Sequence, residues 1–394
     1  MAGAEAESSV LPMSAPLPAL EERFDRLVLL VREIFGTEIA AVNAIEGSRL
    51  VTISMSCDPS VGLHPIPTFC RYTIQQDGIL EVTDLREDSR FSSDALVTGP
   101  SHLRFYAGVP LLARTGQRVA SMCLIDTEPR TLSGRDRAIL RHLGDVAERE
   151  LAVGADLVRA ARVQRSLLPR TAPTLAGLDV AGCVRPARDV GGDFFDWQVI
   201  SSQVNTVDER DRVQVTVADV MGKGLPASLL AAGLRGVLRA HSTYVDLGRA
   251  VHRTKVATQS DLEDNTTFVT LWSTRIDPDT GMLEYLDAGH GLAAIISPEG
   301  LTRRLVQDRP PLGIAWSDDW VTAVDRLAPG EFLLVVSDGI LDVFPDLGTA
   351  LARAEMLAGS TRSSQELADQ IADFATSRES GDDVTALVVR RVAS

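Results

Sequence analysis

The apolar residues in the first part of the chain alternate between helical and strand spacing. Between Leu20 and Phe35 they recur every three or four residues, which predicts an amphipathic helix. A second helix is expected to begin at Gly134, with Ser133 as its N-cap. Runs with strand composition lie between the two helices, at residues 39–42, 50–55, 107–112 and 119–125. This order predicts an α+β domain that ends near Leu151.

Helical spacing continues beyond this domain into a connecting segment. Residues 153–172 are expected to form a linker helix, which ends at Leu168 because Pro169 restricts the residue before it. The apolar residues of this segment also lie near heptad spacing, although a Glu and a Gly interrupt it. A dimeric coiled coil, and with it a homodimer, therefore stays open as an alternative. Residues 1–17 are rich in Ala, Ser and Pro, and we expect them to be a disordered tail.

The pattern changes after Pro173, where short apolar runs separated by turns predominate. Strand composition is found at residues 179–184, 213–218, 268–276, 282–287, 292–296, 332–336 and 384–392. Helical spacing interrupts these runs at residues 226–241, 247–259 and 364–374. Residues 173–394 are therefore expected to form a second domain that is rich in strands.

Composition and charge narrow the classes of function. The 394 residues include 39 basic and 54 acidic side chains, a formal charge of −15, which argues against binding to nucleic acid or to anionic membranes. No apolar run is long enough to cross a bilayer, and the first residues are acidic where a secretion signal would be basic. The four cysteines are scattered without a CxxC pair, as is typical of a reducing compartment. These features predict a cytoplasmic protein.

Four aspartates of the second half share one kind of position, where an apolar strand meets a turn. They are Asp193, Asp219, Asp338 and Asp382. Each alone is typical of an ordinary turn, but together at converging sheet edges they would repel one another and raise their own pKa values. Divalent cations that prefer oxygen ligands, such as Mn²⁺ or Mg²⁺, would remove this conflict. Two such ions can activate a water molecule and clamp a phosphoryl oxygen, which favours hydrolysis of phosphate esters.

The segments around these aspartates resemble the motifs of a known family. In chain order they are VGGDFFDW (190–197), VADVMGKGLPASL (217–229), LDAGHG (286–291), VVSDGILD (335–342) and GDDVTALVV (381–389). Their order and intervals resemble those of PPM-type serine/threonine phosphatases of the SpoIIE/RsbU branch. The upstream segment VQRSLLPR (163–170) resembles the helix that enters this domain. The resemblance implies an αββα sandwich that holds two Mn²⁺ or Mg²⁺ ions and uses a metal-bridged water to hydrolyse phosphoserine or phosphothreonine.

The resemblance also implies roles for individual residues. The implied catalytic residues and metal ligands are the side chains of Asp193, Asp219, Asp338 and Asp382 and the backbone carbonyl of Val220. Asp383 falls at the second position of the last motif, where the family often has Asn, and is not expected to be a primary ligand. Asp196 is expected to support the ligands without binding metal.

Several positions depart from the pattern of the eukaryotic relatives or have two interpretations. Those relatives have a histidine, a proposed general acid, where this chain has Met221. The leaving group must then take its proton from metal-bound water or elsewhere, or the enzyme is slower. Arg188 is a candidate for binding substrate phosphate, or a solvated arginine. Lys223 is a candidate for phosphate or partner binding, with a solvated side chain as the alternative. His290 has no HxH or HExxH partner, and we expect it to stabilise a turn.

The helical segments that follow Asp219 suggest a means of control. A shift of residues 226–241 would move Asp219 and change the affinity for metal, and in related enzymes this region acts as a switch. The alternative is that the same helices form only a static layer of the sandwich.

The first domain, residues 18–152, resembles a GAF sensor domain. The resemblance rests on FDRLVLLVREIFGTEIAAVNAI (24–45), ILEVTDLREDSRF (79–91) and FYAGVPLLARTGQRVASMCLIDTEPRTLS (105–133). It implies a pocket between the sheet and residues 65–103, regulation by an unknown small molecule or protein, and often dimerisation. Cys70 and His102 are candidates for a cofactor there, but ordinary core or loop positions explain them as well, and no ligand is assigned.

The sequence therefore predicts a sensor-regulated, metal-dependent protein serine/threonine phosphatase. By resemblance, its substrate is a phosphorylated anti-anti-sigma protein of the STAS type in a partner-switching pathway. One alternative is a catalytically weak pseudophosphatase that binds such a partner. Another is a hydrolase of a small phosphate ester.

Overall fold

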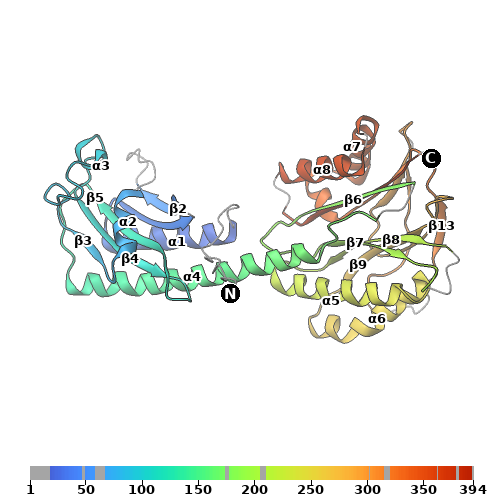
Figure 1. Ribbon diagram of the computed structural model, residues 1–394, viewed down its shortest axis with the longest axis horizontal. Helices are drawn as coiled ribbons and strands as arrows, with labels where there is room; N and C mark the ends of the chain where they lie inside the picture. Colours follow the sequence, from blue (N-terminus) through green and yellow to red (C-terminus); the bar gives the residue numbers. More distant parts are fainter. Residues whose placement is uncertain are drawn as a thin grey trace, which may run out of the picture. The chain divides into compact units, whose positions relative to one another are not determined.

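The structure is a computed structural model in which the chain divides into two compact units, up to Arg159 and from Ala160 onward (Figure 1). It describes residues 18–46, 49–57, 67–173, 177–204, 210–300, 302–314, 320–361, 363–378 and 381–392. The tail predicted over residues 1–17 lies outside these ranges, and its disorder stays a prediction. The predicted linker helix is the last part of α4 (Gly134–Leu167), a single helix of 34 residues.

The first unit is built on one antiparallel sheet of five strands, in the order β2-β1-β5-β4-β3. The strands are β1 (Ile39–Glu46), β2 (Arg49–Cys57), β3 (Leu80–Val82), β4 (Phe105–Leu112) and β5 (Arg118–Asp126). The helices are α1 (Pro18–Phe35), α2 (Pro67–Gln75), α3 (Ala95–Thr98) and α4. The predicted first helix and the predicted strands at residues 107–112 and 119–125 are thereby confirmed, and the two strands pair as an antiparallel hairpin.

Alternate residues of the strands enter two separate cores, one on each face of this sheet. On one face Val42 and Met122 pack with apolar residues of α1 and α4, such as Val28 and Leu140. On the other face the core contains residues of α2 and the segments around α3. The sequence did not predict α2, which has only nine residues and includes β-branched and aromatic side chains.

The second unit contains two antiparallel sheets of five strands each, in the orders β13-β10-β9-β8-β7 and β12-β11-β14-β15-β6. The first comprises β7 (Phe194–Ile200), β8 (Arg212–Val220), β9 (Val269–Ile276), β10 (Met282–Ala288) and β13 (Ala323–Arg326). The second comprises β6 (Leu178–Arg185), β11 (Ala293–Ile296), β12 (Thr302–Arg304), β14 (Phe332–Val336) and β15 (Val384–Arg391). Side chains from both sheets form one buried core, including Val215, Trp272 and Val335, so the sheets pack face to face.

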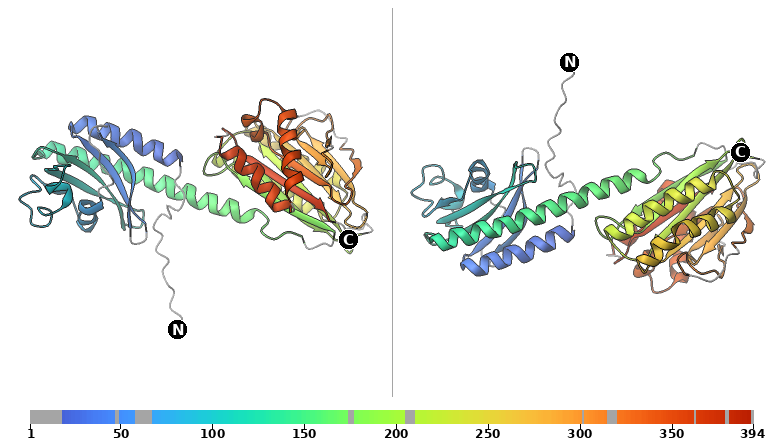
Figure 2. Two further views of the ribbon diagram at one scale, coloured as in Figure 1. Left: turned by 90° about the horizontal axis from the view of Figure 1, so that it is seen from above. Right: turned by 90° about the horizontal axis from the view of Figure 1, so that it is seen from below.

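Two pairs of helices cover the outer faces of these sheets (Figure 2). α5 (Leu225–Ser242) and α6 (Leu247–Asp264) share a buried core with β7, β8, β9 and β10. α7 (Leu347–Ser360) and α8 (Ser364–Thr376) share another with β14 and β15, next to the short 3₁₀ helix η1 (Asp338–Val343). The layers are helix, sheet, sheet and helix, which confirms the predicted αββα sandwich. The sequence did not predict α7.

Among the described residues, no helix combines the length and the apolar character that crossing a bilayer would need.

Candidate metal centre

The four predicted aspartates lie at one end of the sandwich, where strands of both sheets end. Asp193 immediately precedes β7 and Asp219 lies near the end of β8. Because Phe194 pairs with Ala218, continuing this antiparallel register places Asp193 opposite Asp219. Asp338 follows β14 and begins η1, whereas Asp382 precedes β15, the neighbour of β14 in the other sheet.

Hydrogen bonds join the two sheets at this end. The Oγ1 of Thr385, on β15, donates to Oδ2 of Asp193 over 2.6 Å. Ser337, which follows β14, accepts at Oγ from the Thr385 amide over 2.8 Å and donates to the Asp383 carbonyl over 3.2 Å. The loop that carries Asp193 is therefore fixed to the facing sheet as well as to its own.

The carboxylates of this cluster affect one another strongly. Burial, and then the charges of Asp219 and Asp383, raise the pKa of Asp193 well above its usual range. Burial and the charge of Asp338 raise the pKa of Asp219 to about 7. Burial and the charge of Asp382 likewise raise the pKa of Asp338. Such repulsion is the conflict that a bound divalent cation relieves, and an all-oxygen donor set suits Mg²⁺ or Mn²⁺.

The carboxylates of the cluster do not surround a preformed metal site. Within the ranges that the structure describes, no three His, Cys, Asp or Glu side chains form a ready-made metal cage. Two of the acids bond to other groups. Asp382 forms an ion pair of 3.0 Å with Lys223, and Asp383 faces backbone amides. The predicted ligands are near one another but are not arranged around a common point.

Asp383 has a structural role that the sequence did not indicate. Its Oδ1 accepts from the Ala187 amide and its Oδ2 from the Gly192 amide, both over 2.8 Å. Gly191 is needed here because a Cβ at that position would clash with the Asp383 carboxylate, and a Cβ on Gly192 would clash with the Val220 carbonyl. Asp383 therefore holds the Gly-Gly loop against β15 and thereby positions Asp193.

We expect Asp383→Ala to weaken Mn²⁺ binding by roughly 10–100-fold, the effect usual for residues that orient metal ligands. Asp383→Asn retains one acceptor oxygen and is expected to have a smaller effect. Calorimetric titration of the purified variants with Mn²⁺ measures both affinities. Unchanged affinity in Asp383→Ala would show that the loop keeps its position without this carboxylate.

The remaining sequence candidates differ in where they lie. Lys223 is bound at the cluster, because its Nζ also donates to the Gly381 carbonyl over 2.6 Å, so it is more than a solvated side chain. Arg188 is exposed on the bend before Asp193, and Met221 is exposed just after Val220.

His290 lies in a turn in which its amide donates to Asp287 over 2.7 Å. Burial lowers the pKa of His290 to about 4, which suits a neutral structural histidine.

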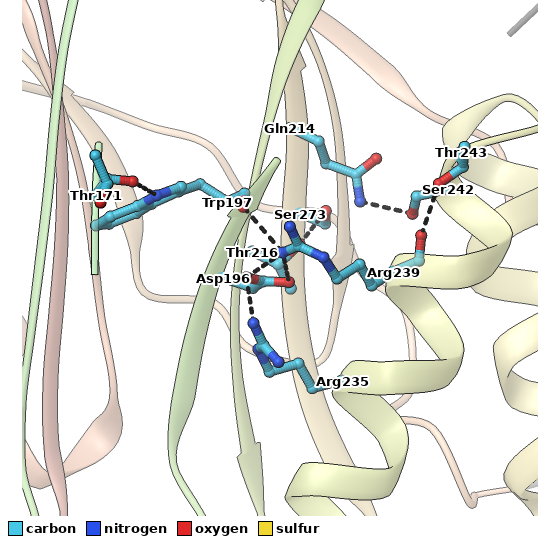
Figure 3. Close-up of polar contacts among 10 residues, drawn as sticks. All are labelled: Thr171, Asp196, Trp197, Gln214, Thr216, Arg235, Arg239, Ser242, Thr243 and Ser273. Atoms are coloured by element: carbon cyan, nitrogen blue, oxygen red, sulfur yellow. Dashed lines mark hydrogen bonds and ion pairs between the residues drawn. The ribbon is translucent and has the colours of Figure 1, made fainter. Parts of the chain in front are cut away.

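Asp196 binds two arginines of α5, Arg235 and Arg239 (Figure 3). It accepts from Arg235 over 3.0 Å and from Arg239 over 2.8 Å. Arg239 also donates to the Trp197 carbonyl over 3.1 Å, and the Trp197 indole donates to the Thr171 carbonyl over 2.8 Å. The network joins α5, the helix that follows Asp219, to the strand that follows Asp193.

We expect Asp196→Ala to lower the free energy of unfolding of the second unit by about 2–4 kcal/mol, because it leaves Arg235 largely buried without its carboxylate. All four tryptophans lie in the second unit, so urea denaturation followed by tryptophan fluorescence reports on this unit. Asp279→Ala is the control, because that side chain is 78% exposed and its loss is expected to change stability by less than about 0.5 kcal/mol. Equal effects of the two substitutions would contradict the prediction.

The predicted pocket of the first unit would lie between the sheet and residues 65–103. Among the described residues, aromatic side chains pack on the α2 side of the sheet, including Phe69, Phe91 and Tyr106, with ring centroids of Phe69 and Phe91 5.1 Å apart. Cys70 is buried in this core, whereas His102 is exposed. Part of the segment 65–103 lies outside the described residues, so the predicted pocket stays a prediction.

Comparison with known proteins agrees with this architecture. Residues 209–392 match the family described as Stage II sporulation protein E (SpoIIE), and residues 19–151 match the GAF domain. The phosphoserine phosphatase RsbU of Bacillus subtilis is 23% identical over 248 residues, which cover 61% of this chain and 71% of RsbU. Protein IcfG of Synechocystis is 25% identical over 214 residues, 48% of this chain, so the chain spans only 32% of that relative.

Solved structures also include proteins with the fold of the second unit. The SiaA-PP2C domain of Pseudomonas aeruginosa aligns with a TM-score of 0.51 and 22% identity, covering 62% of this chain and 99% of that domain. The expected pair of domains is thereby confirmed, a GAF domain followed by a SpoIIE-type domain with the PPM phosphatase fold.

Proposed function

We propose that this chain, a GAF domain joined to a SpoIIE family domain, is a metal-dependent protein serine/threonine phosphatase. The observation that carries the proposal is the cluster of mutually repelling aspartates at the end of the sandwich. Similarity to RsbU, itself a phosphoserine phosphatase, supports the same class of reaction. A chain that uses these carboxylates only as turn residues has no reason to bury them against one another.

Two Mn²⁺ or Mg²⁺ ions are the proposed cofactors, and this chain's residues hold them. The proposed ligands are Asp193, Asp219, Asp338, Asp382 and the carbonyl oxygen of Val220. When bound, the ions supply Lewis acidity for water and charge neutralisation for the phosphoryl group. To hold a metal ion, Asp382 would have to give up its ion pair with Lys223, and the Lys223 ammonium would then be available to the substrate phosphate.

The proton that the serine or threonine leaving group needs does not come from residue 221. The methionine thioether there has no ionisable proton, so another group must supply it. Arg188, exposed on the loop before Asp193, is proposed to pair with the incoming phosphate.

The proposed substrate is a phosphorylated anti-anti-sigma protein of the STAS type. Its support is the likeness to RsbU over 61% of this chain and the ordered motifs between residues 163 and 392. The GAF domain is proposed to receive a small-molecule or protein signal. α5 is the proposed switch, because it begins five residues beyond Val220 and is bound to β7 through Asp196.

The test is an assay of the purified chain with added Mn²⁺, on para-nitrophenyl phosphate, a phospho-STAS protein and free phosphate metabolites. Hydrolysis that depends on Mn²⁺ and is lost in Asp338→Asn supports the phosphatase. Faster turnover of the phosphoprotein than of any metabolite supports the substrate class, and the reverse order indicates a hydrolase of small esters. Binding of the phosphoprotein without turnover indicates a pseudophosphatase.

A further inference from the structure

Two cysteine thiols lie side by side in the core of the GAF domain. Cys70 is on α2 and Cys123 is on β5, far apart in the sequence, and both are fully buried. Their Sγ atoms are 3.7 Å apart, which is close to van der Waals contact between two sulfurs. The tertiary structure alone brings this pair together, because the sequence has no closely spaced cysteines.

Polar groups surround this pair within an otherwise apolar core. The Nδ2 of Asn43 donates to Sγ of Cys70 over 3.3 Å and lies 3.8 Å from Sγ of Cys123. The hydroxyl of Tyr106 donates to Sγ of Cys70 over 3.6 Å. The Asn43 amide is oriented by Thr52, whose Oγ1 donates to Oδ1 of Asn43 over 2.7 Å. Two donors therefore converge on Cys70, which favours its thiolate form.

The two sulfurs are not equivalent. The hydrogen bond with Cys123 lowers the pKa of Cys70, while burial opposes that shift. The hydrogen bond with Cys70 and burial raise the pKa of Cys123 well above its usual range. Cys183, which is in the other unit, has its pKa raised to about 12, chiefly by burial. The Tyr106 hydroxyl donates to Cys70, and the Asn43 amide lies nearer to Cys70 than to Cys123. We therefore assign Cys70 as the nucleophile and Cys123 as the thiol that resolves the intermediate.

A metal site is the other chemistry that two thiols suggest. Such a site needs further ligands, usually four in all for the ions that prefer sulfur. Within the part of the chain that the structure describes, no third His, Cys, Asp or Glu joins the pair. The nearest polar groups are an amide and two hydroxyls, which are weak ligands for such metals. A dithiol that exchanges with a disulfide suits these neighbours better.

We propose that Cys70 and Cys123 form a reversible disulfide when the protein meets a small peroxide, so that the GAF domain contains a redox-sensitive site. The Cys70 thiolate attacks one oxygen of hydrogen peroxide, the O–O bond breaks, and the released hydroxide is protonated and leaves as water. Cys123 then gives up its proton and attacks the sulfenic sulfur of Cys70, and the S–O bond breaks to release a second water. Two thiols and one peroxide yield one disulfide and two waters.

Burial makes this reaction slow but selective. The sulfurs must approach one another by roughly 1.6 Å to reach disulfide bonding distance. Peroxide reaches them when α2, a helix of nine residues, opens locally, which requires less free energy than global unfolding. Bulky thiol reagents are excluded in the closed state. The pair is therefore expected to react with hydrogen peroxide in the native protein while large alkylating reagents leave it untouched.

The test follows the thiols, so it does not rest on the proposed phosphatase activity. The full chain is reduced, freed of reductant and treated with hydrogen peroxide under native conditions. Its mass is measured by mass spectrometry, and we expect a loss of about 2 Da, for the two hydrogens removed. The protein is then unfolded and alkylated, and its mass is measured again. Peptide mapping should find Cys70 linked to Cys123, and dithiothreitol should restore both thiols. The double variant Cys57→Ser, Cys183→Ser should behave in the same way.

Two variants examine the assignment further. Cys70→Ser is expected to lose the disulfide, and Asn43→Leu, which removes the amide donor but keeps both thiols, is expected to slow its formation severalfold. Wild-type mapping decides the outcome even if these variants fold poorly. The proposal is overturned if peroxide leaves both thiols free to alkylation, if Cys57 forms the linkage instead, or if Cys70 gains oxygen without joining Cys123.

Discussion

Replacing Asp219 by asparagine is expected to lower the turnover number for Mn²⁺-dependent hydrolysis by about a thousandfold or more, beyond the 10–100-fold typical of residues that only orient ligands. Burial and the charge of Asp338 raise the pKa of Asp219, with further contributions from Asp382 and Asp383. Asp219 therefore interacts electrostatically with several acids of the cluster. The proposed ions need its negative charge, which asparagine lacks. Both metal affinity and catalysis should therefore fall together.

The measurement is kcat for para-nitrophenyl phosphate across a range of Mn²⁺ concentrations, beside the calorimetric affinity for Mn²⁺. Asp211→Asn is the matched control, because Asp211 is exposed next to the other end of the same strand, β8. It should retain wild-type activity. Activity of Asp219→Asn within a few fold of wild type, at saturating Mn²⁺, would remove Asp219 from the proposed metal centre.

The stability of the metal-free protein is expected to fall as pH rises through the range in which the cluster ionises. A carboxyl whose pKa is raised by folding contributes stability that is present below its unfolded pKa and is lost as pH rises through the folded value. For Asp219 this window runs from 3.8 to about 7, and the loss is about 4 kcal/mol at roughly 1.4 kcal/mol per pKa unit. Asp193 and Asp338 shift in the same direction.

His290 acts with the opposite sign and must be separated from this effect. Burial lowers its pKa to about 4, so its contribution is present above its unfolded pKa of 6.5 and is lost as pH falls. Comparing wild type with Asp219→Asn cancels this contribution, because both proteins keep His290. Between pH 4 and 7.5 in EDTA, the unfolding free energy of the wild type should decline relative to that of the variant.

The same measurement of stability against pH is then repeated with Mn²⁺ added. Because the ions bind the ionised carboxylates, the stabilisation by Mn²⁺ should be small in acid and should grow as pH rises. Urea denaturation followed by tryptophan fluorescence measures both series in the second unit. A difference between wild type and Asp219→Asn that does not change with pH would show that Asp219 does not titrate in this window.

The network around Asp196 gives the proposed switch a physical basis. α5 follows Asp219 in the chain and is bound through Arg235 and Arg239 to β7, which begins directly after Asp193. A movement of α5 would therefore displace Asp193 and Asp219, the two predicted ligands next to or on the strands β7 and β8. Loss of the Asp196 contacts should uncouple the helix from that sheet, so the stability experiment on Asp196→Ala also probes the connection on which the proposal depends.

The sequence alone determined the features that depend on local periodicity and on residue type. The spacing of apolar residues along the chain predicts long amphipathic helices such as α1 and α5 and apolar strands such as β14. The motifs around Asp193, Asp219, Asp338 and Asp382 also identified the candidate ligands. Short or ambiguous elements such as α2 and α7 escaped prediction, because their conformation depends on the sheet against which they pack.

Only the tertiary structure decided which side chains meet across long stretches of chain. Asp383 reaches the amides of Ala187 and Gly192, Lys223 reaches Asp382, and Cys70 reaches Cys123 because separate strands and helices converge there. None of these contacts follows from spacing along the chain, since a hydrogen bond or ion pair acts over a few ångströms while the partners are many residues apart. Sequence patterns reveal which residues face a core, whereas packing determines their partners.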